Sequence, residues 1–213
     1  RFYRQLLLTA PGMGRCISGV ILFDETTRQK TEDGVPFVEL LSLNGVHPGI
    51  KTDQGLEDFG KYGEQTTKSL DGLETRSRDY EATGLVFAKA RSVYKITPDT
   101  PTDELIRQNA KFQAEYALIS QAAGLVPIVE PEVLIDGAHS IARCRETSLK
   151  VLGSVFGELT SMGVDLSGML LKPSMVTPGK LSQEKVSDEV IAQETVQVLL
   201  KTVPLKVPGI VFL

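Results

Sequence analysis

A lysine interrupts an apolar stretch in the last quarter of the sequence. Lys172 lies within GMLLKPSM, Gly168 to Met175, which is otherwise typical of a strand that becomes buried. A buried ammonium ion is costly unless it is paired or loses its proton. Lys172 is therefore either a strand-end residue that reaches water or an amine used in chemistry. The second interpretation, chemistry at a lysine with a depressed pKa, is the sharper hypothesis.

Other charged residues also stand near the ends of apolar runs. Lys89 and Arg91 are two residues apart in LVFAKAR, and Glu130 and Glu132 are two apart in LVPIVEPE. Residues two apart in a strand point to the same face, so each pair shares one side. Carboxylates serve in general acid–base catalysis, and cations bind anions such as phosphates. With Lys51 at the end of HPGIK, these residues predict one pocket that holds several cations and two carboxylates.

Six short apolar runs supply the strands that would position these side chains. Each has the length and composition of a buried parallel strand. The segments between them show helical periodicity, most clearly over 105–123 before a capping Gly124 and after the candidate N-cap Ser187. The runs are GVILF (19–23), HPGIK (47–51), LVFAKAR (85–91), LVPIVEPE (125–132), GMLLKP (168–173) and PGIVFL (208–213).

Alternating strands and helices predict an α/β fold with a parallel sheet. The spacing alone allows either a doubly wound sheet or a (β/α)8 TIM barrel. A barrel draws its active site from the carboxyl ends of several strands, where the charged residues stand. A doubly wound sheet usually carries a glycine-rich phosphate loop, and neither PGMG (11–14) nor GSVFG (153–157) has the spacing of one. The charged strand ends therefore favour the barrel.

The composition limits the class of protein and its partners. A chain of 213 residues with 41% hydrophobic residues can enclose one core, so we expect a single domain over 1–213. A net charge of −4 without a basic stripe argues against nucleic acid as a partner. No apolar run approaches the roughly 18 residues of a membrane helix, so no membrane is expected. Two cysteines without the spacing of a disulfide framework or a zinc site indicate a reducing compartment, so we expect a cytoplasmic protein.

Four blocks of the sequence resemble class I fructose-bisphosphate aldolase. They are ILFDET, FAKAR, VPIVEPE and LLKPSMVTPG, in this order and at these separations, and RFYRQLLLTA and DGLETRSRDY also resemble the family. The family's AADES-like segment precedes the matched region, and its SGGQ-like and YGR-like segments follow it. The resemblance therefore implies about six of the eight β/α units of a TIM barrel, in a single domain that is incomplete at both ends.

The resemblance also implies an activity. Class I aldolases cleave fructose 1,6-bisphosphate reversibly to dihydroxyacetone phosphate and glyceraldehyde 3-phosphate in glycolysis and gluconeogenesis. They are usually homotetramers and use no metal or other cofactor, since the substrate is held as an imine. Lys172 in LLKP matches the lysine that forms this Schiff base, and Glu130 matches the general acid and base of its formation.

The remaining site residues are assigned by the same resemblance. Glu132 matches a carboxylate that orients the Schiff-base lysine. Lys89 in FAKAR matches a lysine beside the reacting carbons, whose like charge favours a neutral Schiff-base amine. Arg91 and Lys51 match cations of the pocket that attract the phosphates of the substrate.

Two other functions are consistent with these residues. One is an aldolase-like barrel that binds or scaffolds without catalysis, which the absence of the AADES-like aspartate favours, because that residue is a general base in the family. The other is a different Schiff-base aldolase, such as a transaldolase or a deoxyribose-phosphate aldolase. Those families do not show VPIVEPE followed by LLKP, and a substrate with one phosphate needs fewer cations.

Overall fold

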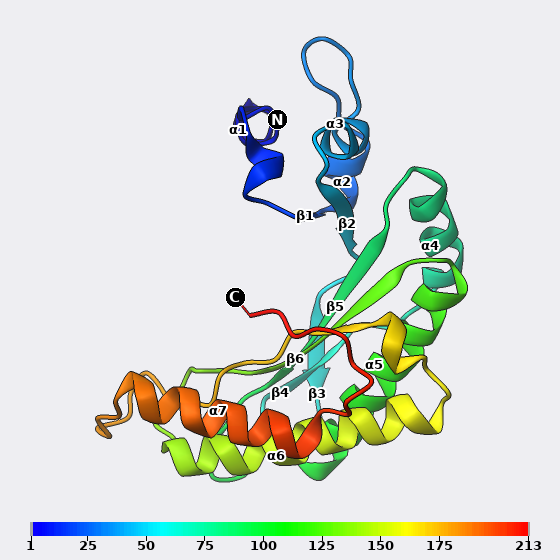
Figure 1. Ribbon diagram of the computed structural model, residues 1–213. Coiled ribbons are helices and arrows are strands. Elements are labelled where there is room, and N and C mark those ends of the chain that lie inside the picture. The colour runs from blue at the N-terminus through cyan, green and yellow to red at the C-terminus, as the bar shows by residue number, and fades with distance from the viewer. Residues whose placement is uncertain (1, 213) are drawn as a thin grey trace.

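The computed structural model describes residues 2–212 and is built on a five-stranded parallel sheet (Figure 1). The strands are paired in the order in which they occur along the chain, β1-β2-β5-β6-β7. A doubly wound sheet reverses its direction at a switch point, whereas here every new strand joins the same edge. This order is that of a (β/α) barrel, which the charged strand ends predict. The strands are β1 (Gly19–Leu22), β2 (His47–Lys51), β5 (Phe87–Tyr94), β6 (Val126–Val133) and β7 (Leu170–Leu171).

The longest helices cover one side of this sheet. Helix α5 (Asp103–Ala122) packs on β5 and β6, α6 (Ile141–Ser161) packs on α5 and β6, and α7 (Asp188–Thr202) packs on α6. Figure 1 shows α6 and α7 side by side on the side of the sheet away from both termini. The smaller helices are α1 (Phe2–Leu8), α2 (Asp24–Thr27), α3 (Phe37–Leu43) and α4 (Leu73–Ala82), with 3-10 turns at Met13–Arg15 and Leu166–Gly168.

The predicted helix signals are confirmed at both ends of the helices. Ser187 caps α7, where its side chain accepts a hydrogen bond from the Val190 N–H. Gly124 follows α5 with φ of 82°, the left-handed conformation in which glycine carries no steric penalty. No helix within residues 2–212 is long and apolar enough to cross a membrane.

The sheet has a helix-covered face and an open face. On β5, Ala88 and Ala90 are completely buried against the helix layer, where Gln113 of α5 donates to the Ala90 carbonyl at 3.3 Å. Lys89 and Arg91 alternate with them and therefore point to the opposite face. The same alternation on β2, β6 and β7 fills the core with residues from the covered face, namely Ile50, Val129 and Leu171, each with no exposed surface. The ionisable residues are left on the open face.

The last two predicted strands are shorter than expected. GMLLKP forms only the two-residue strand β7, and the run 208–213 makes a single parallel bridge between Ile210 and Leu171, with Leu213 outside the described residues. Pro173 ends β7 because proline has no N–H for a ladder. The Val211 N–H still donates to the Leu171 carbonyl at 2.9 Å. The prediction of a sixth full strand is wrong, although its residues lie beside β7.

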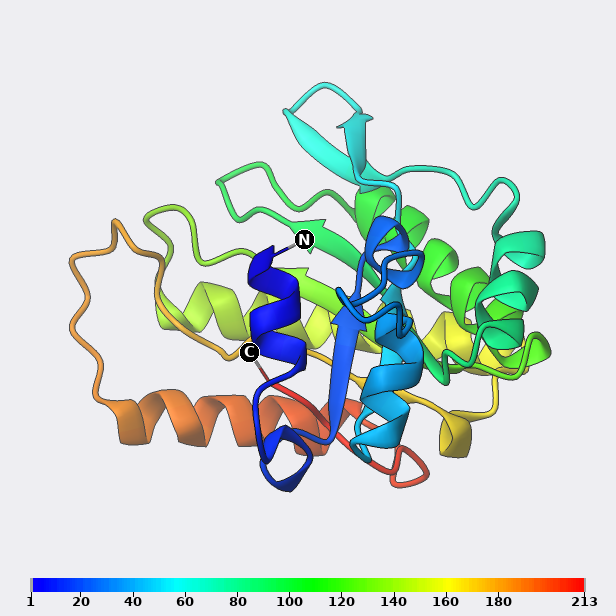
Figure 2. The same ribbon diagram turned by 90° about the horizontal axis from the view of Figure 1, so that it is seen from above.

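The sequence pattern did not predict a hairpin between β2 and β5. Strands β3 (Leu56–Phe59) and β4 (Glu64–Thr67) pair antiparallel through a turn that uses positive φ angles at Gly60 and Gly63. Figure 2 shows this cyan hairpin projecting from one edge of the molecule. Both strands are rich in polar residues, so a search for apolar runs cannot detect them. Thr66 instead bonds to Asn109 of α5 at 2.8 Å.

A buried carboxylate of the hairpin binds the start of α5. The Glu64 side chain accepts from the Thr102 N–H at 2.8 Å and from the Thr102 hydroxyl at 2.6 Å. We expect Glu64→Ala to lower the free energy of unfolding by about 2 kcal/mol, since it leaves donors at the helix start without a partner. Urea denaturation measures this loss. Glu57→Ala, on the exposed side of β3, is the control and should stay within about 0.5 kcal/mol; equal losses would contradict the proposed contact.

Candidate active site

Ionisable side chains from neighbouring strands meet on the open face of the sheet. Lys51 ends β2, Lys89 lies within β5, Glu130 lies within β6, and Lys172 follows β7 directly. Lys51 and Lys89 are partners in the β2–β5 register. The Lys172 N–H donates to the Val129 carbonyl at 2.8 Å, which fixes the lysine beside β6. The parallel order of the strands therefore brings together residues that are far apart in the sequence.

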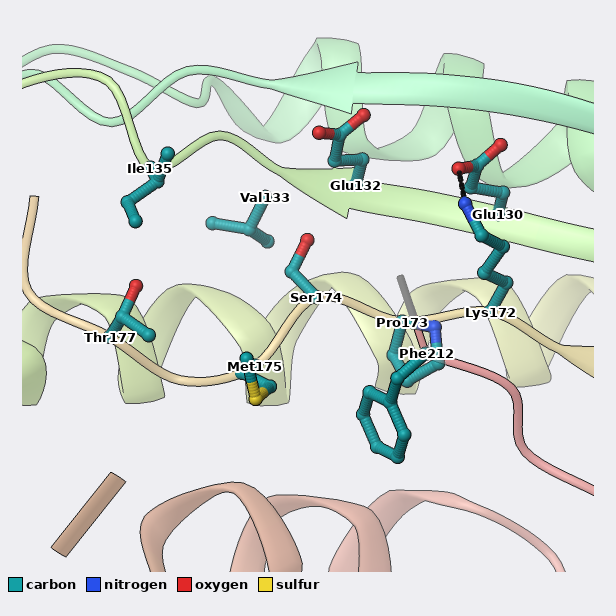
Figure 3. A pocket seen from close by; sticks show the side chains of 10 residues that line it. All are labelled: Glu130, Glu132, Val133, Ile135, Lys172, Pro173, Ser174, Met175, Thr177 and Phe212. Atoms are coloured by element: carbon teal, nitrogen blue, oxygen red, sulfur yellow. Dashed lines mark hydrogen bonds and ion pairs between the residues drawn. The ribbon is translucent and has the colours of Figure 1, made fainter. Parts of the chain in front are cut away.

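Glu130 occupies the centre of this group. Its Oε1 accepts a hydrogen bond from the Lys172 ammonium, as Figure 3 shows, and its Oε2 lies 2.6 Å from Lys89 Nζ. The carboxylate is 5% exposed and the two lysine side chains are 10% and 12% exposed. Interactions between charges are strong at such depth, and each ion depends on its partners for the solvation it has lost. One carboxylate thus bridges two buried cations.

Asp53 was not predicted and belongs to the same group. Its Oδ1 accepts a hydrogen bond from Lys51, and its Oδ2 lies 4.0 Å from Lys89 Nζ. The side chain is only 5% exposed. Asp53 follows Lys51 by two residues, as Arg91 follows Lys89 and Glu132 follows Glu130, so the spacing that singled out those pairs could also have indicated this one. The aspartate was overlooked because it lies beyond the end of the apolar run.

Arg91 and Glu132 form a separate ion pair beside the group. Arg91 Nε contacts Glu132 Oε2, with side chains 39% and 25% exposed. The resemblance predicted that Glu132 orients Lys172, but in this structure its ionic partner is Arg91. The two cations assigned to phosphates, Arg91 and Lys51, are thus each paired with a carboxylate of the protein. A phosphate that binds them must compete with these carboxylates or share the cations with them.

Glu130 and Lys172 border a small cavity. The space measures about 160 Å³ and is lined by Glu130, Glu132 and Lys172 together with the segment that follows Lys172. In Figure 3 the Ser174 hydroxyl points towards the side of the cavity where Glu132 lies. A hydroxyl group at this position can donate a hydrogen bond to a bound substrate or accept one from it. Ser174 had no strand position or charge that would single it out in the sequence.

The arrangement has the parts needed for imine chemistry. An amine that can lose its proton forms a covalent bond to a carbonyl carbon, and an adjacent carboxyl group moves the protons that this requires. Further cations beside the pair attract anionic substrates. Within residues 2–212, no cluster of three or more His, Cys, Asp or Glu side chains is placed to hold a metal ion.

The whole chain matches class I fructose-bisphosphate aldolases. A family model described as "Fructose-bisphosphate aldolase class-I" matches residues 1–213. The cytosolic fructose-bisphosphate aldolase 5 of Arabidopsis thaliana is 55% identical over 211 residues, which are 99% of this chain and 59% of that protein. A probable class 1 fructose-bisphosphate aldolase of Xanthomonas axonopodis pv. citri is 49% identical over 214 residues, which are 100% of this chain and 64% of that protein.

A solved structure agrees with these matches. It is a ternary complex of fructose-bisphosphate aldolase from Plasmodium falciparum with TRAP and a small-molecule inhibitor. The TM-score is 0.97 at 46% identity, and the match covers 99% of this chain and 62% of that chain. This chain therefore spans less than two thirds of the length of these relatives. Its parallel sheet is part of a TIM barrel, as the charged strand ends predict, and the chain belongs to the class I fructose-bisphosphate aldolase family.

Proposed function

We propose that this chain carries the Schiff-base centre of a class I aldolase that cleaves fructose 1,6-bisphosphate. The products are dihydroxyacetone phosphate and glyceraldehyde 3-phosphate, and the reaction is reversible and needs no metal or other cofactor. The observation that carries the proposal is the buried Glu130 carboxylate shared between Lys172 and Lys89. The cytosolic names of relatives favour a cytoplasmic enzyme, and the family resemblance favours a homotetramer.

Lys172 is proposed as the nucleophile. Its neutral amine adds to the C2 ketone of the substrate, which gives a carbinolamine with a C–N bond in place of the C=O double bond. Glu130 contacts the Lys172 nitrogen, so it can take up the proton that the Lys172 ammonium loses before attack and later give it to the departing hydroxyl. In between, one proton of the attacking amine moves to the former carbonyl oxygen and makes that hydroxyl. Water leaves, and a protonated imine remains on Lys172.

The imine makes carbon–carbon cleavage possible. It withdraws the electron pair of the C3–C4 bond, so that bond breaks to give an enamine on Lys172 and free glyceraldehyde 3-phosphate. The proton of the C4 hydroxyl passes to a base, which the family resemblance assigns to the aspartate of the AADES-like segment. Protonation of the enamine at C3 and hydrolysis of the imine then release dihydroxyacetone phosphate and restore Lys172.

The cations around the pair are proposed to bind the two phosphates. Lys89 lies closest to the bridging carboxylate and keeps positive charge beside the reacting carbons. Arg91 and Lys51 are proposed to attract the phosphates, and Glu132 holds Arg91 in place. A substrate with two phosphates matches a pocket with several cations better than a substrate with one.

Borohydride trapping tests this function directly. The protein is incubated with dihydroxyacetone phosphate in excess chelator and reduced, and the adduct is located by intact mass and peptide mapping. We expect one adduct, on the peptide that contains Lys172, together with cleavage of fructose 1,6-bisphosphate that exceeds cleavage of fructose 1-phosphate. No adduct on a folded protein would overturn the proposal. An adduct without cleavage would instead support an aldolase-like barrel that has lost catalysis.

A further inference from the structure

Asp53 makes the contacts of Lys51, Lys89 and Lys172 unequal. Glu130 alone would leave Lys89 and Lys172 in similar positions, since each contacts one oxygen of the same carboxylate. Lys89 also has Asp53 Oδ2 at 4.0 Å, whereas within residues 2–212 the acidic contact of Lys172 is Glu130. Lys89 therefore lies between two carboxylates and Lys172 beside one.

The placement of Asp53 allows it to act on Lys89 through charge. Asp53 Oδ2 is buried and has no hydrogen-bond partner among the described residues, while Oδ1 binds Lys51. A buried carboxylate oxygen at this distance favours the charged form of an ammonium group, and Lys51 shares the charge of the same carboxylate. Among the described residues, Glu130 from β6 also contacts Lys89, and the fully buried Tyr116 from α5 is close enough to Asp53 to sense its charge. Burial, with a smaller contribution from Asp53, raises the pKa of Tyr116, so this phenol stays neutral and adds no charge.

We propose that Asp53 is a positioning residue that holds Lys89 as an ammonium ion, so that the lysine of the group that gives up its proton is Lys172. The count of charges agrees with this assignment. Three lysines and two carboxylates carry a net charge of +1, and the group becomes neutral when a single lysine loses its proton. Without Asp53, either Lys89 or Lys172 can be the lysine that loses its proton. In molecules in which Lys89 is neutral, Lys172 stays charged and cannot attack a carbonyl. The inference rests on the proposed Schiff-base function.

Residue-resolved acetylation against pH tests the assignment. Acetic anhydride reacts with an amine only in its neutral form, and peptide mapping gives the labelling rate of each lysine separately. Burial lowers the labelling rate of a lysine at every pH. The pH at which the rate is half of its maximum, the midpoint, reports the loss of the proton from that lysine. In the unsubstituted protein we expect a lower midpoint for Lys172 than for Lys89. The reverse order would overturn the proposal without any variant.

The matched variants are Asp53→Asn and Asp58→Asn. Asp58 is an exposed residue of β3, so its substitution removes the same charge at the surface. We expect Asp53→Asn to lower the Lys89 midpoint by about one pH unit, a tenfold change in proton affinity. The rate of trapping on Lys172 at pH 7 should fall about tenfold, and Asp58→Asn should change neither quantity. Asp53→Glu, which keeps the charge, should recover most of the Lys89 midpoint.

The outcomes separate this inference from the proposed function. Equal Lys89 midpoints in the two asparagine variants, with circular dichroism showing both folded, would overturn the role of Asp53. Absence of a trapped adduct in the unsubstituted protein would overturn the Schiff-base function, and the acetylation midpoints would still show whether Asp53 controls the charge of Lys89.

Discussion

Replacing Lys172 by arginine is expected to abolish the borohydride-trapped adduct and to lower cleavage of fructose 1,6-bisphosphate on the order of 10⁵-fold. A guanidinium keeps the positive charge and can still pair with Glu130, so the fold and the field of the pocket are largely retained. It does not lose its proton near neutral pH and therefore cannot add to a ketone. The substitution thus separates the nucleophile from the charge. Intact mass after reduction and steady-state cleavage measure the two effects.

Lys180→Arg is the matched control for this substitution. Lys180 lies in the segment after β7, its side chain is 63% exposed, and its ionic contact is Asp136 at 3.5 Å. An exposed pair of this kind contributes little to stability. We expect the control to form the adduct and to retain activity within about twofold, because Lys180 does not line the cavity beside Lys172. A persistent adduct in the Lys172→Arg variant would show that another lysine is the nucleophile.

The features that followed from the sequence depend on rules that act within one strand. Alternation along β5 and β6 placed Lys89 and Glu130 on one face, and the ends of the apolar runs placed both near the carboxyl edge of the sheet. These rules need no knowledge of neighbouring strands. The helix caps at Ser187 and Gly124 were predictable for the same reason, since they depend on a few adjacent residues.

The features that were missed depend on contacts between segments. The hairpin β3–β4 is held by polar contacts, such as the hydrogen bond between Thr66 and Asn109. A pattern of apolar residues cannot predict such contacts. The partner of Glu132 could not be chosen from the sequence, because β6 has β5 on one side and β7 on the other. The register sets Arg91 opposite Glu130 and Val93 opposite Glu132, so the Arg91–Glu132 ion pair runs diagonally between β5 and β6 and does not follow from the pattern of either strand alone.

Glu130→Gln is expected to lower kcat for fructose 1,6-bisphosphate cleavage about 10³-fold, within the range of a lost general acid–base group. An amide has almost the same shape as the carboxyl group but cannot carry protons between the amine and the departing hydroxyl. The rate of imine trapping on Lys172 should fall with kcat, since imine formation is the step that needs this proton. The substitution also removes the charge shared by Lys89 and Lys172. Breaking such a buried arrangement is expected to lower the free energy of unfolding by about 3 kcal/mol.

Glu132→Gln provides the comparison within the same strand. Its side chain is 25% exposed and pairs with an arginine that is 39% exposed, so water can replace much of the lost interaction. We therefore expect a loss of unfolding free energy below about 1 kcal/mol. Imine trapping should change tenfold or less, because among the described residues Glu132 pairs with Arg91 whereas Lys172 pairs with Glu130. Urea denaturation and single-turnover trapping measure both variants under the same conditions. If the two substitutions slowed trapping equally, the proton transfer would belong to the pair of glutamates, and the position of Glu130 between two lysines would not explain the chemistry.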